Sequence, residues 1–305
     1  MRITSVLLLL FVAAAMAQET RISGPVSAWV FDHSERSLRP IIGSPGSAYL
    51  GPAAVTELDF ASIAPDGRSA LAVRSGTLWL GALIDGGWAW GSLRDQGASS
   101  IAWDRSAGAA VVYETAPRRL TLFRGLDAEA KSEPLAALPE GELTALAVDS
   151  DAVLAAVGDA VYRIDAASAK LLANVEKVSA IVLRGGDLYA ADRARGEIAR
   201  LRNYREPSGL ERVAAVEAPV AMSLGADGAT LLVAGAGKLV TLDAASGTVT
   251  REWITPAVVD RLEMAGELHL LNARLRAEDV LHVLDNGSVW FVPAGRVTLS
   301  EPSDK

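Results

Sequence analysis

The three histidines of this 305-residue chain are its most versatile candidates for chemistry, because imidazole serves both as a metal ligand and as a general base. His269 and His282 lie in neighbouring stretches expected to be strands. With Asp285, and with His33 if the chain ends meet, they could form a tetrahedral metal site. However, "LHLL" and "LHVL" are ordinary half-buried strand contexts. We therefore expect structural histidines and assign no metal ligand.

Four aspartates occupy equivalent places in the hairpins expected along the chain, namely Asp66, Asp104, Asp149 and Asp227. A ring of carboxylates could bind Ca²⁺, which takes six to eight oxygen ligands. An aspartate in a turn also accepts hydrogen bonds from its own backbone. Because equivalent positions in different repeats lie far apart, the sequence favours the turn interpretation.

Nucleophilic and phosphate-binding motifs are missing. The chain has no cysteine, which excludes disulfides, thiol nucleophiles, cysteine zinc sites, c-type haem attachment and a lipid-bearing cysteine. "GSPGS" at residues 43–47 is a Pro-Gly turn rather than a nucleophile elbow. "AGAGK" at residues 234–238 lacks the spacing of a phosphate-binding loop and indicates a hairpin. We assign no catalytic residue, no cofactor-binding residue and no cofactor.

Three surface features each have two interpretations. One repeat contains three tryptophans, Trp79, Trp88 and Trp90, and the next contains Trp103. These rings could bind a glycan or a peptide, but we favour packing between repeats. The five arginines of residues 193–206 could bind an anionic partner, but we expect them simply to point outward. "DNGS" at residues 285–288 matches a glycosylation sequon, but Asn-Gly between two apolar runs predicts a type I′ turn.

Composition and charge narrow the class of protein. Hydrophobic residues make up 50% of the chain, the net charge is −8 and the pI is near 5.1. Such a chain can bury a large core, and its acidic balance makes nucleic acid and anionic membranes poor partners. We expect a monomer.

The first 17 residues, "MRITSVLLLLFVAAAMA", are typical of a secretory signal peptide, with a basic Arg2, an apolar stretch and a small-x-small ending. The apolar stretch is too short to span about 30 Å of hydrocarbon. We expect cleavage after Ala17, no membrane insertion afterwards, and a periplasmic or extracellular protein.

Short apolar runs separated by turn residues recur along the rest of the chain. The central apolar residues of the first run in each copy lie 38, 45, 35, 43 and 38 residues apart. They are Ile63, Ile101, Leu146, Ile181, Leu224 and Leu262. A period near 40 filled by short strands predicts an all-β fold, a β-propeller of four-stranded antiparallel blades.

We expect seven blades, with six or eight as alternatives, because residues 18–58 amount to about one more period. The prediction is a single domain over residues 18–298, closed where the N-terminal strands meet the C-terminal hairpin, followed by a flexible tail at 299–305. Closure removes the edges that an open sheet exposes.

The repeats resemble those of YVTN, NHL and quinoprotein-like propellers, including secreted bacterial ones. "LDAASGTVTREW" at residues 242–253 resembles the tryptophan-docking repeat of quinoprotein-like propellers, and "IDAASAKLLAN" at 164–174 is a weaker copy without its Gly and Trp. The Gly-His and Trp-Asp signature of WD40 repeats is missing. The resemblance implies a fold and not a site.

Export, an intact repeat and no catalytic motif together predict a non-catalytic binding or scaffold propeller that engages a protein, peptide or glycan. The alternative is a metal-dependent hydrolase of the lactonase type, which would hold a divalent ion in the central channel. No metal motif of that family can be matched in this sequence. A quinone-dependent dehydrogenase is disfavoured by the missing cysteines. We therefore expect no enzymatic activity, with the lactonase type kept open.

Overall fold

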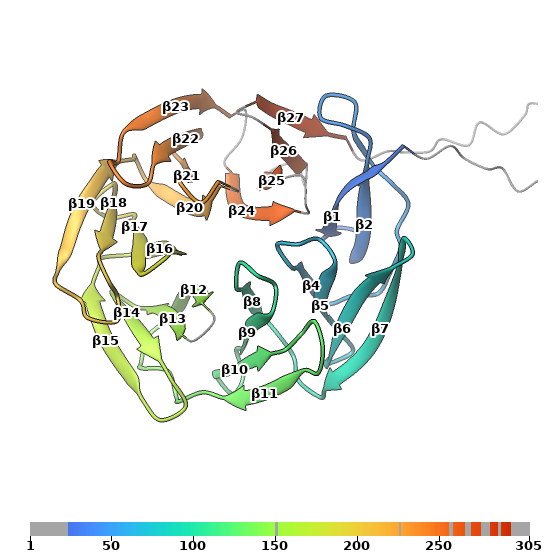
Figure 1. The fold of residues 1–305 in the computed structure, drawn as a ribbon, viewed down its shortest axis with the longest axis horizontal. Coiled ribbons are helices and arrows are strands. Elements are labelled where there is room, and N and C mark those ends of the chain that lie inside the picture. The colour runs from blue at the N-terminus through green and yellow to red at the C-terminus, as the bar shows by residue number, and fades with distance from the viewer. Residues whose placement is uncertain are drawn as a thin grey trace, which may run out of the picture.

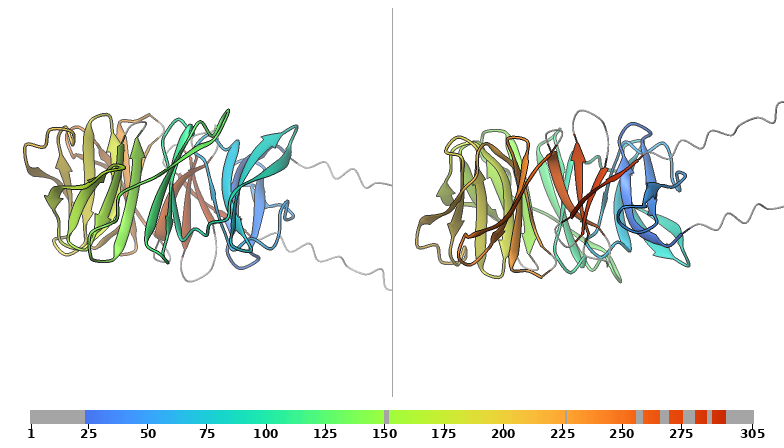
Figure 2. Two further views of the ribbon diagram at one scale, coloured as in Figure 1. Left: turned by 90° about the horizontal axis from the view of Figure 1, so that it is seen from below. Right: turned by 90° about the horizontal axis from the view of Figure 1, so that it is seen from above.

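The computed structural model describes residues 24–149, 152–225, 227–255, 259–265, 270–275, 281–285 and 288–293. This part of the chain contains 27 β-strands and no helix. The strands form small sheets that stand side by side around a centre, as the view along the shortest axis shows (Figure 1). Seen from the edge, the molecule is a thick disc (Figure 2). The predicted all-β propeller is confirmed.

Six blades are four-stranded antiparallel sheets whose strands follow one another in chain order from the centre outward. Their strands are β4 (Phe60–Ile63), β5 (Ser69–Arg74), β6 (Thr77–Ile84) and β7 (Gly87–Arg94); β8 (Ser100–Trp103), β9 (Ala109–Glu114), β10 (Arg119–Arg124) and β11 (Lys131–Pro134); β12 (Leu143–Asp149), β13 (Ala152–Val157), β14 (Ala160–Ile164) and β15 (Ala169–Asn174); β16 (Val178–Arg184), β17 (Asp187–Asp192), β18 (Glu197–Leu201) and β19 (Leu210–Ala215); β20 (Pro219–Leu224), β21 (Thr230–Gly235), β22 (Lys238–Asp243) and β23 (Val249–Ile254); β24 (Val259–Ala265), β25 (Leu270–Leu275), β26 (Leu281–Asp285) and β27 (Ser288–Val292).

The expectation of seven four-stranded blades is wrong. Besides the six complete blades, the described part holds one three-stranded sheet of β1 (Val26–Asp32), β2 (Ser37–Ile42) and β3 (Tyr49–Leu50). The predicted count was wrong because residues 18–58 amount to a full period in length, whereas their described part, residues 24–58, contains three strands. All six predicted anchor residues do lie in the innermost strands β4, β8, β12, β16, β20 and β24.

Strand position within a blade determines its residue pattern. All six side chains of β13 are buried, because a middle strand is covered on both faces by neighbouring blades. All four side chains of the outermost strand β11 are exposed.

The hairpin turns contain residues that tolerate positive φ. Asp85 and Gly86 join β6 to β7 with φ values of 50° and 80°, as a two-residue hairpin requires.

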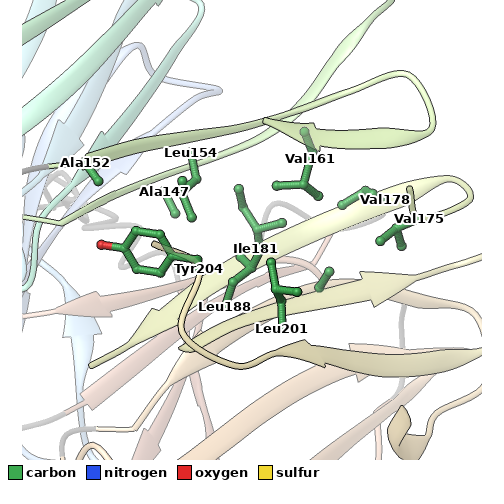
Figure 3. Packing of buried hydrophobic residues seen from close by; sticks show 12 residues of the cluster. Ala147, Ala152, Leu154, Val161, Val175, Val178, Ile181, Leu188, Leu201 and Tyr204 are labelled. Atoms are coloured by element: carbon green, nitrogen blue, oxygen red, sulfur yellow. The ribbon is translucent and has the colours of Figure 1, made fainter. Parts of the chain in front are cut away.

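The hydrophobic core is divided into clusters between adjacent blades. One of them joins Leu154 and Val161 of one blade to Leu188 and Leu201 of the next, with the ring of Tyr204 beside them (Figure 3). Burying each of these side chains contributes about 1.5–3 kcal/mol. A blade therefore depends on its neighbours for stability.

The first and last described strands lie side by side. The Leu50 amide donates a 3.1 Å hydrogen bond to the Pro293 carbonyl, and Val292 packs in a buried cluster with Val30 and Ile41. Figure 1 shows β27 next to the sheet of β1 and β2. This contact is a seam between the two ends of the described chain. Within the described residues, no helix has the length and apolarity needed to cross a bilayer.

Candidate functional site: the central cavity

A cavity of about 380 Å³ lies at the centre of the ring. Its walls come from the innermost strands of all six complete blades, and β1, β2 and β3 contribute nothing to them. Innermost strands run side by side around the centre, so every blade places part of one strand in the wall. The volume is that of a typical small-ligand pocket.

The cavity wall is mainly apolar. Leu146, Val182, Leu224 and Met264 come from four different blades, line the cavity and remain partly exposed. Trp103 of β8 joins them, and its Nε1 donates a 3.2 Å hydrogen bond to Ser62 Oγ in the preceding blade. Partly exposed aliphatic and aromatic groups around a hollow favour binding of apolar groups, because such binding removes this surface from water.

Charged groups of the wall are concentrated on one strand. Asp260, Arg261 and Glu263 all lie on β24 and line the cavity. Arg261 forms an ion pair with Glu263, and its guanidinium carbon lies 5.7 Å from the centre of the Phe60 ring. Within this pair the charges compensate each other, and Asp260 leaves β24 with one excess negative charge at the wall.

One mouth of the cavity is bridged by arginine. Arg105, in the β8–β9 turn, donates a 3.4 Å hydrogen bond to the Gly225 carbonyl, which lies 120 residues further along the chain. Arg184 Nε donates a 2.6 Å bond to the Gly228 carbonyl in the same β20–β21 turn. Two arginines from different blades therefore hold one turn of a third blade.

Asp227 belongs to this bridged turn. Burial opposes its ionisation, but hydrogen bonds from the amides of Ala229 and Thr230 and from the Thr230 hydroxyl outweigh burial. Together with the charge of Arg105, they lower the pKa of Asp227. The turn thus presents a fixed carboxylate beside the arginines.

The predicted turn role is confirmed for three of the four aspartates. Asp66 accepts a 2.9 Å bond from the Arg68 amide, Asp104 accepts a 2.8 Å bond from the Ala109 amide, and Asp227 behaves as described above. The turn that follows Asp149 lies outside the described residues, and Asp149 Oδ2 accepts a 2.9 Å bond from the Tyr204 hydroxyl of the next blade. No local pattern indicated this partner, which is 55 residues away in the chain.

The histidines are only partly within the described chain. His33 follows β1, and its ring centre is 4.5 Å from that of Phe31, in an aromatic contact. His282 and Asp285 are backbone positions in β26, and His269 and Asn286 lie outside the described residues. Asp285 pairs with Ser288 across the expected hairpin. Among described residues, no three His, Asp or Glu side chains are grouped as metal ligands.

The tryptophans separate into two environments. Trp88 stacks on Trp90 with ring centres 5.6 Å apart, Trp29 meets Trp88 edge-on at 5.5 Å, and this group packs on buried residues such as Leu38. This is the predicted packing between sheets. Trp103 lies outside this group but also packs between blades, against the cluster that contains Leu71 and Val112, and it lines the cavity because it is on an innermost strand.

The arginines of residues 193–206 are mostly paired. Arg200 and Arg202 both contact Glu211, and Arg205 lies 3.3 Å from Asp149. Arg202 is 62% exposed, as predicted, but Arg200 is only 10% exposed, because it lies beneath Glu211 and also donates to the Ala245 carbonyl. The outward orientation was therefore wrong for Arg200.

A central channel was considered only for the lactonase-type alternative, and the residues that line the cavity were not predicted. Its charged residues Arg105, Arg261 and Glu263 drew no attention in the sequence, because single charges in separate repeats form no local motif. The signal that could have found them is a polar residue next to the anchor positions of the innermost strands, such as Arg261 and Glu263 around Leu262.

Comparisons with known proteins identify the fold. No family model matches the chain, and no curated protein matches it. Solved structures do match over most of its length. A functionally unknown protein from Desulfotomaculum acetoxidans DSM 771 is 14% identical with a TM-score of 0.62, covering 88% of this chain and 99% of that one.

Two propellers with established names are also similar. Streptogramin B lyase is 13% identical with a TM-score of 0.59, covering 78% of this chain and 83% of its own. The WD40 β-propeller domain of Doa1 is 16% identical with a TM-score of 0.55, covering 76% and 81%. The chain is thus a β-propeller structurally similar to WD40 propellers and to streptogramin B lyase, with no specific family shown.

Proposed function

We propose that this protein is an exported, non-catalytic binding propeller whose central cavity receives apolar side chains of a peptide or protein partner. The observation that carries the proposal is the wall itself, in which Leu146, Val182, Leu224 and Met264 leave apolar surface partly exposed around one hollow. A soluble fold gains nothing from such exposure, whereas a partner that covers it gains hydrophobic free energy.

The chemistry of the wall favours a peptide over a glycan. Sugar rings need many hydrogen-bonding partners in addition to aromatic contacts, and the polar groups of this wall are concentrated on β24 and at Arg105, Ser62, Ser179 and Ser223. About 380 Å³ accommodates a few side chains rather than a folded domain. We therefore expect a partner that inserts a short apolar segment while its remainder rests on the rim.

The lactonase-type alternative would need oxygen ligands converging from several blades. The carboxylates that line the described cavity, Asp260 and Glu263, both come from β24. Metal analysis of the purified protein tests this alternative directly, since one tightly bound divalent ion per chain would favour hydrolysis and count against our proposal.

Peptide selection tests the cavity as the binding site. A displayed random peptide library is selected on the wild-type protein, and the enriched peptides are synthesised and measured by fluorescence anisotropy. We expect apolar peptides that bind Val182→Glu at least about tenfold more weakly, which corresponds to about 1.4 kcal/mol. Val249→Glu is the matched control, because Val249 is 49% exposed on the outermost strand β23.

Thermal unfolding of both variants is measured to check that each remains folded. Peptides that bind wild type and Val182→Glu equally would place the binding site elsewhere and overturn the proposal. Export is tested separately: the mass of the protein recovered from its native host should correspond to a chain that begins at Gln18.

A further inference from the structure

The outermost strand β7 has one edge that no described strand covers. With eight residues, β6 and β7 are the longest of the described strands, whereas the other outermost strands contain two to six residues. Figure 1 shows β7 on the rim of the disc, and among the described strands only β6 pairs with it. A free strand edge presents backbone amides and carbonyls that can pair with a further strand.

The register of β6 and β7 identifies the residues of β7 that face outward. The Leu83 amide of β6 donates a 2.8 Å hydrogen bond to the Arg68 carbonyl, so Leu83 directs its backbone groups away from β7. Its antiparallel partner Trp88 must then direct its own amide and carbonyl away from β6. Because this direction alternates along a strand, Trp90 and Ser92 also direct their backbone groups outward.

The edge of β7 lacks the features that usually protect a free edge. Short length, charged side chains and proline all oppose the pairing of edges between molecules. The uncharged outermost strands β3 and β27 contain only two and five residues. Longer ones contain charged residues or proline, namely Lys131, Glu133 and Pro134 in β11, Lys170 in β15, Glu211 and Arg212 in β19, and Arg251 and Glu252 in β23. Residues 87–93 of β7 contain neither a charge nor a proline.

We propose that β7 pairs antiparallel with β7 of a second copy of this chain, around a two-fold axis at Trp90. In this register Trp90 lies opposite Trp90 of the second copy, and Trp88 of each copy lies opposite Ser92 of the other. It is the one register in which each of the three outward-facing residues meets another. Their amides and carbonyls then bond across the edge, as in any antiparallel ladder.

Side chains in this register match in size. Trp88 of one copy neighbours the small Ser92 of the other, and Ala89 neighbours Gly91. A Cβ at Gly91 would meet no atom within 4 Å, so the space beside this residue is open. The two Trp90 rings form an aromatic cross-strand pair at the axis, and pairs of this kind stabilise antiparallel sheets.

The charges at the two ends of β7 have opposite signs. Asp85 lies in the turn before the strand, Arg94 is its last residue, and both are exposed. In the proposed pair, Arg94 of each copy lies against the Asp85–Gly86 turn of the other. Unlike charges therefore meet at both ends, which favours the antiparallel orientation. Backbone, size and charge together fit a second copy better than an unrelated strand.

Dimerisation through β7 leaves the central cavity accessible, because no residue of β7 lines it. One particle would then present two cavities, which strengthens binding to a partner with two matching segments. The inference does not depend on what the cavity binds. It departs from the monomer expected from the sequence, because the free edge becomes visible only when the strands are placed.

Analytical ultracentrifugation of the full-length chain without residues 1–17 tests the proposal. We expect a monomer–dimer equilibrium between about 1 and 100 µM. Gly91→Lys should weaken dimerisation at least about tenfold, because a lysine opposes edge pairing, and the space around Gly91 lets the monomer fold. Leu171→Lys is the matched control on the outermost strand β15, where Leu171 is 47% exposed. A monomer at every concentration, or equal dimerisation of both variants, would overturn the proposal.

Amide exchange measured by NMR identifies the paired edge. At the same high concentration, the amides of Trp88 and Trp90 should exchange at least about tenfold more slowly in the wild type than in Gly91→Lys. The Ala89 amide, which faces β6 in the alternation, should exchange equally in both proteins. A wild-type dimer in which Trp88 and Trp90 exchange as fast as in the variant would be held together by another surface, and the proposal would be wrong.

Discussion

Tyr204 and Asp149 join two neighbouring blades, because the Tyr204 hydroxyl donates a 2.9 Å hydrogen bond to Asp149 Oδ2 across the interface. The Tyr204 ring is fully buried in the cluster that those blades share. Tyr204→Phe keeps the packing and removes only the hydroxyl. We expect the free energy of unfolding in urea to fall by about 1 kcal/mol.

Tyr49→Phe serves as its control, because Tyr49 is 41% exposed and should lose nothing measurable. An equal loss in the two variants would show that the bond between the blades contributes nothing specific.

Gly247 lies in the segment that resembles a tryptophan-docking repeat. Its φ is +73°, and a Cβ at this position would overlap the carbonyl oxygen of Val213. Gly247→Ala therefore combines backbone strain with a clash against backbone, and we expect a loss of at least about 3 kcal/mol in chemical denaturation.

Gly86→Ala separates these two effects. Gly86 has φ +80° but no atom within 4 Å of the added Cβ. Only the strain remains there, so the loss should be about 1 kcal/mol. Comparable losses at both glycines would contradict the role of the Val213 carbonyl.

The Asp32 carboxylate makes stability depend on pH. Burial raises its pKa, but hydrogen bonds from Ser34 and Glu35 and the 3.0 Å contact with Arg39 outweigh burial and lower the pKa below the ordinary 3.8. A depressed folded-state pKa stabilises the fold above the unfolded-state value, and this contribution is lost as the pH falls through the folded-state pKa. Asp32→Asn should thus cost about 2 kcal/mol at pH 7.

The cost of Asp32→Asn should shrink toward zero as the pH falls below 3.8, measured by urea denaturation across that range. Glu35→Gln, an exposed change in the same turn, removes the same charge and should show no such trend. A penalty that is constant with pH would rule out the ionised carboxylate as its source.

Arg105 should control entry to the cavity, since its side chain reaches from the β8–β9 turn to the Gly225 carbonyl. We expect Arg105→Ala to leave stability within about 0.5 kcal/mol, because Arg105 is exposed. Association of the neutral apolar dye N-phenyl-1-naphthylamine should become severalfold faster in stopped-flow fluorescence. Arg68→Ala, in the equivalent turn of another blade, is the control, and identical rates in both variants would contradict the bridge.

Much of the fold could be predicted from local signals. Strand periodicity and turn residues placed all six anchors, from Ile63 to Leu262, in innermost strands, because these signals depend only on neighbouring residues. The aspartate turns were predictable for the same reason. The hairpin at residues 242–253 was found through its resemblance, and Trp253 packs beside a cluster that includes Leu239 and Leu262.

The blade count and the site could not be predicted in the same way. "DHSERSLRPI" at residues 32–41 matches "DRARGEIARL" at 192–201, a second-to-third-strand hairpin, but length alone made the first sheet look complete. Arg105 and Gly225 are 120 residues apart, and their contact exists only because the ring brings their turns together. Which side chains meet at the cavity therefore depends on how the blades close into a ring, and not on any local sequence pattern.

The seam at Leu50 and Pro293 has a consequence for chain connectivity. Because the last described strand packs against the sheet that contains the first, a linker could join the two ends of the chain and new termini could be opened in an outer loop, such as the one between Ile84 and Gly87. Such a circularly permuted protein should keep the same blades in the same order around the ring. The succession of the strands is cyclic, and the position at which translation begins is only one of several equivalent starting points.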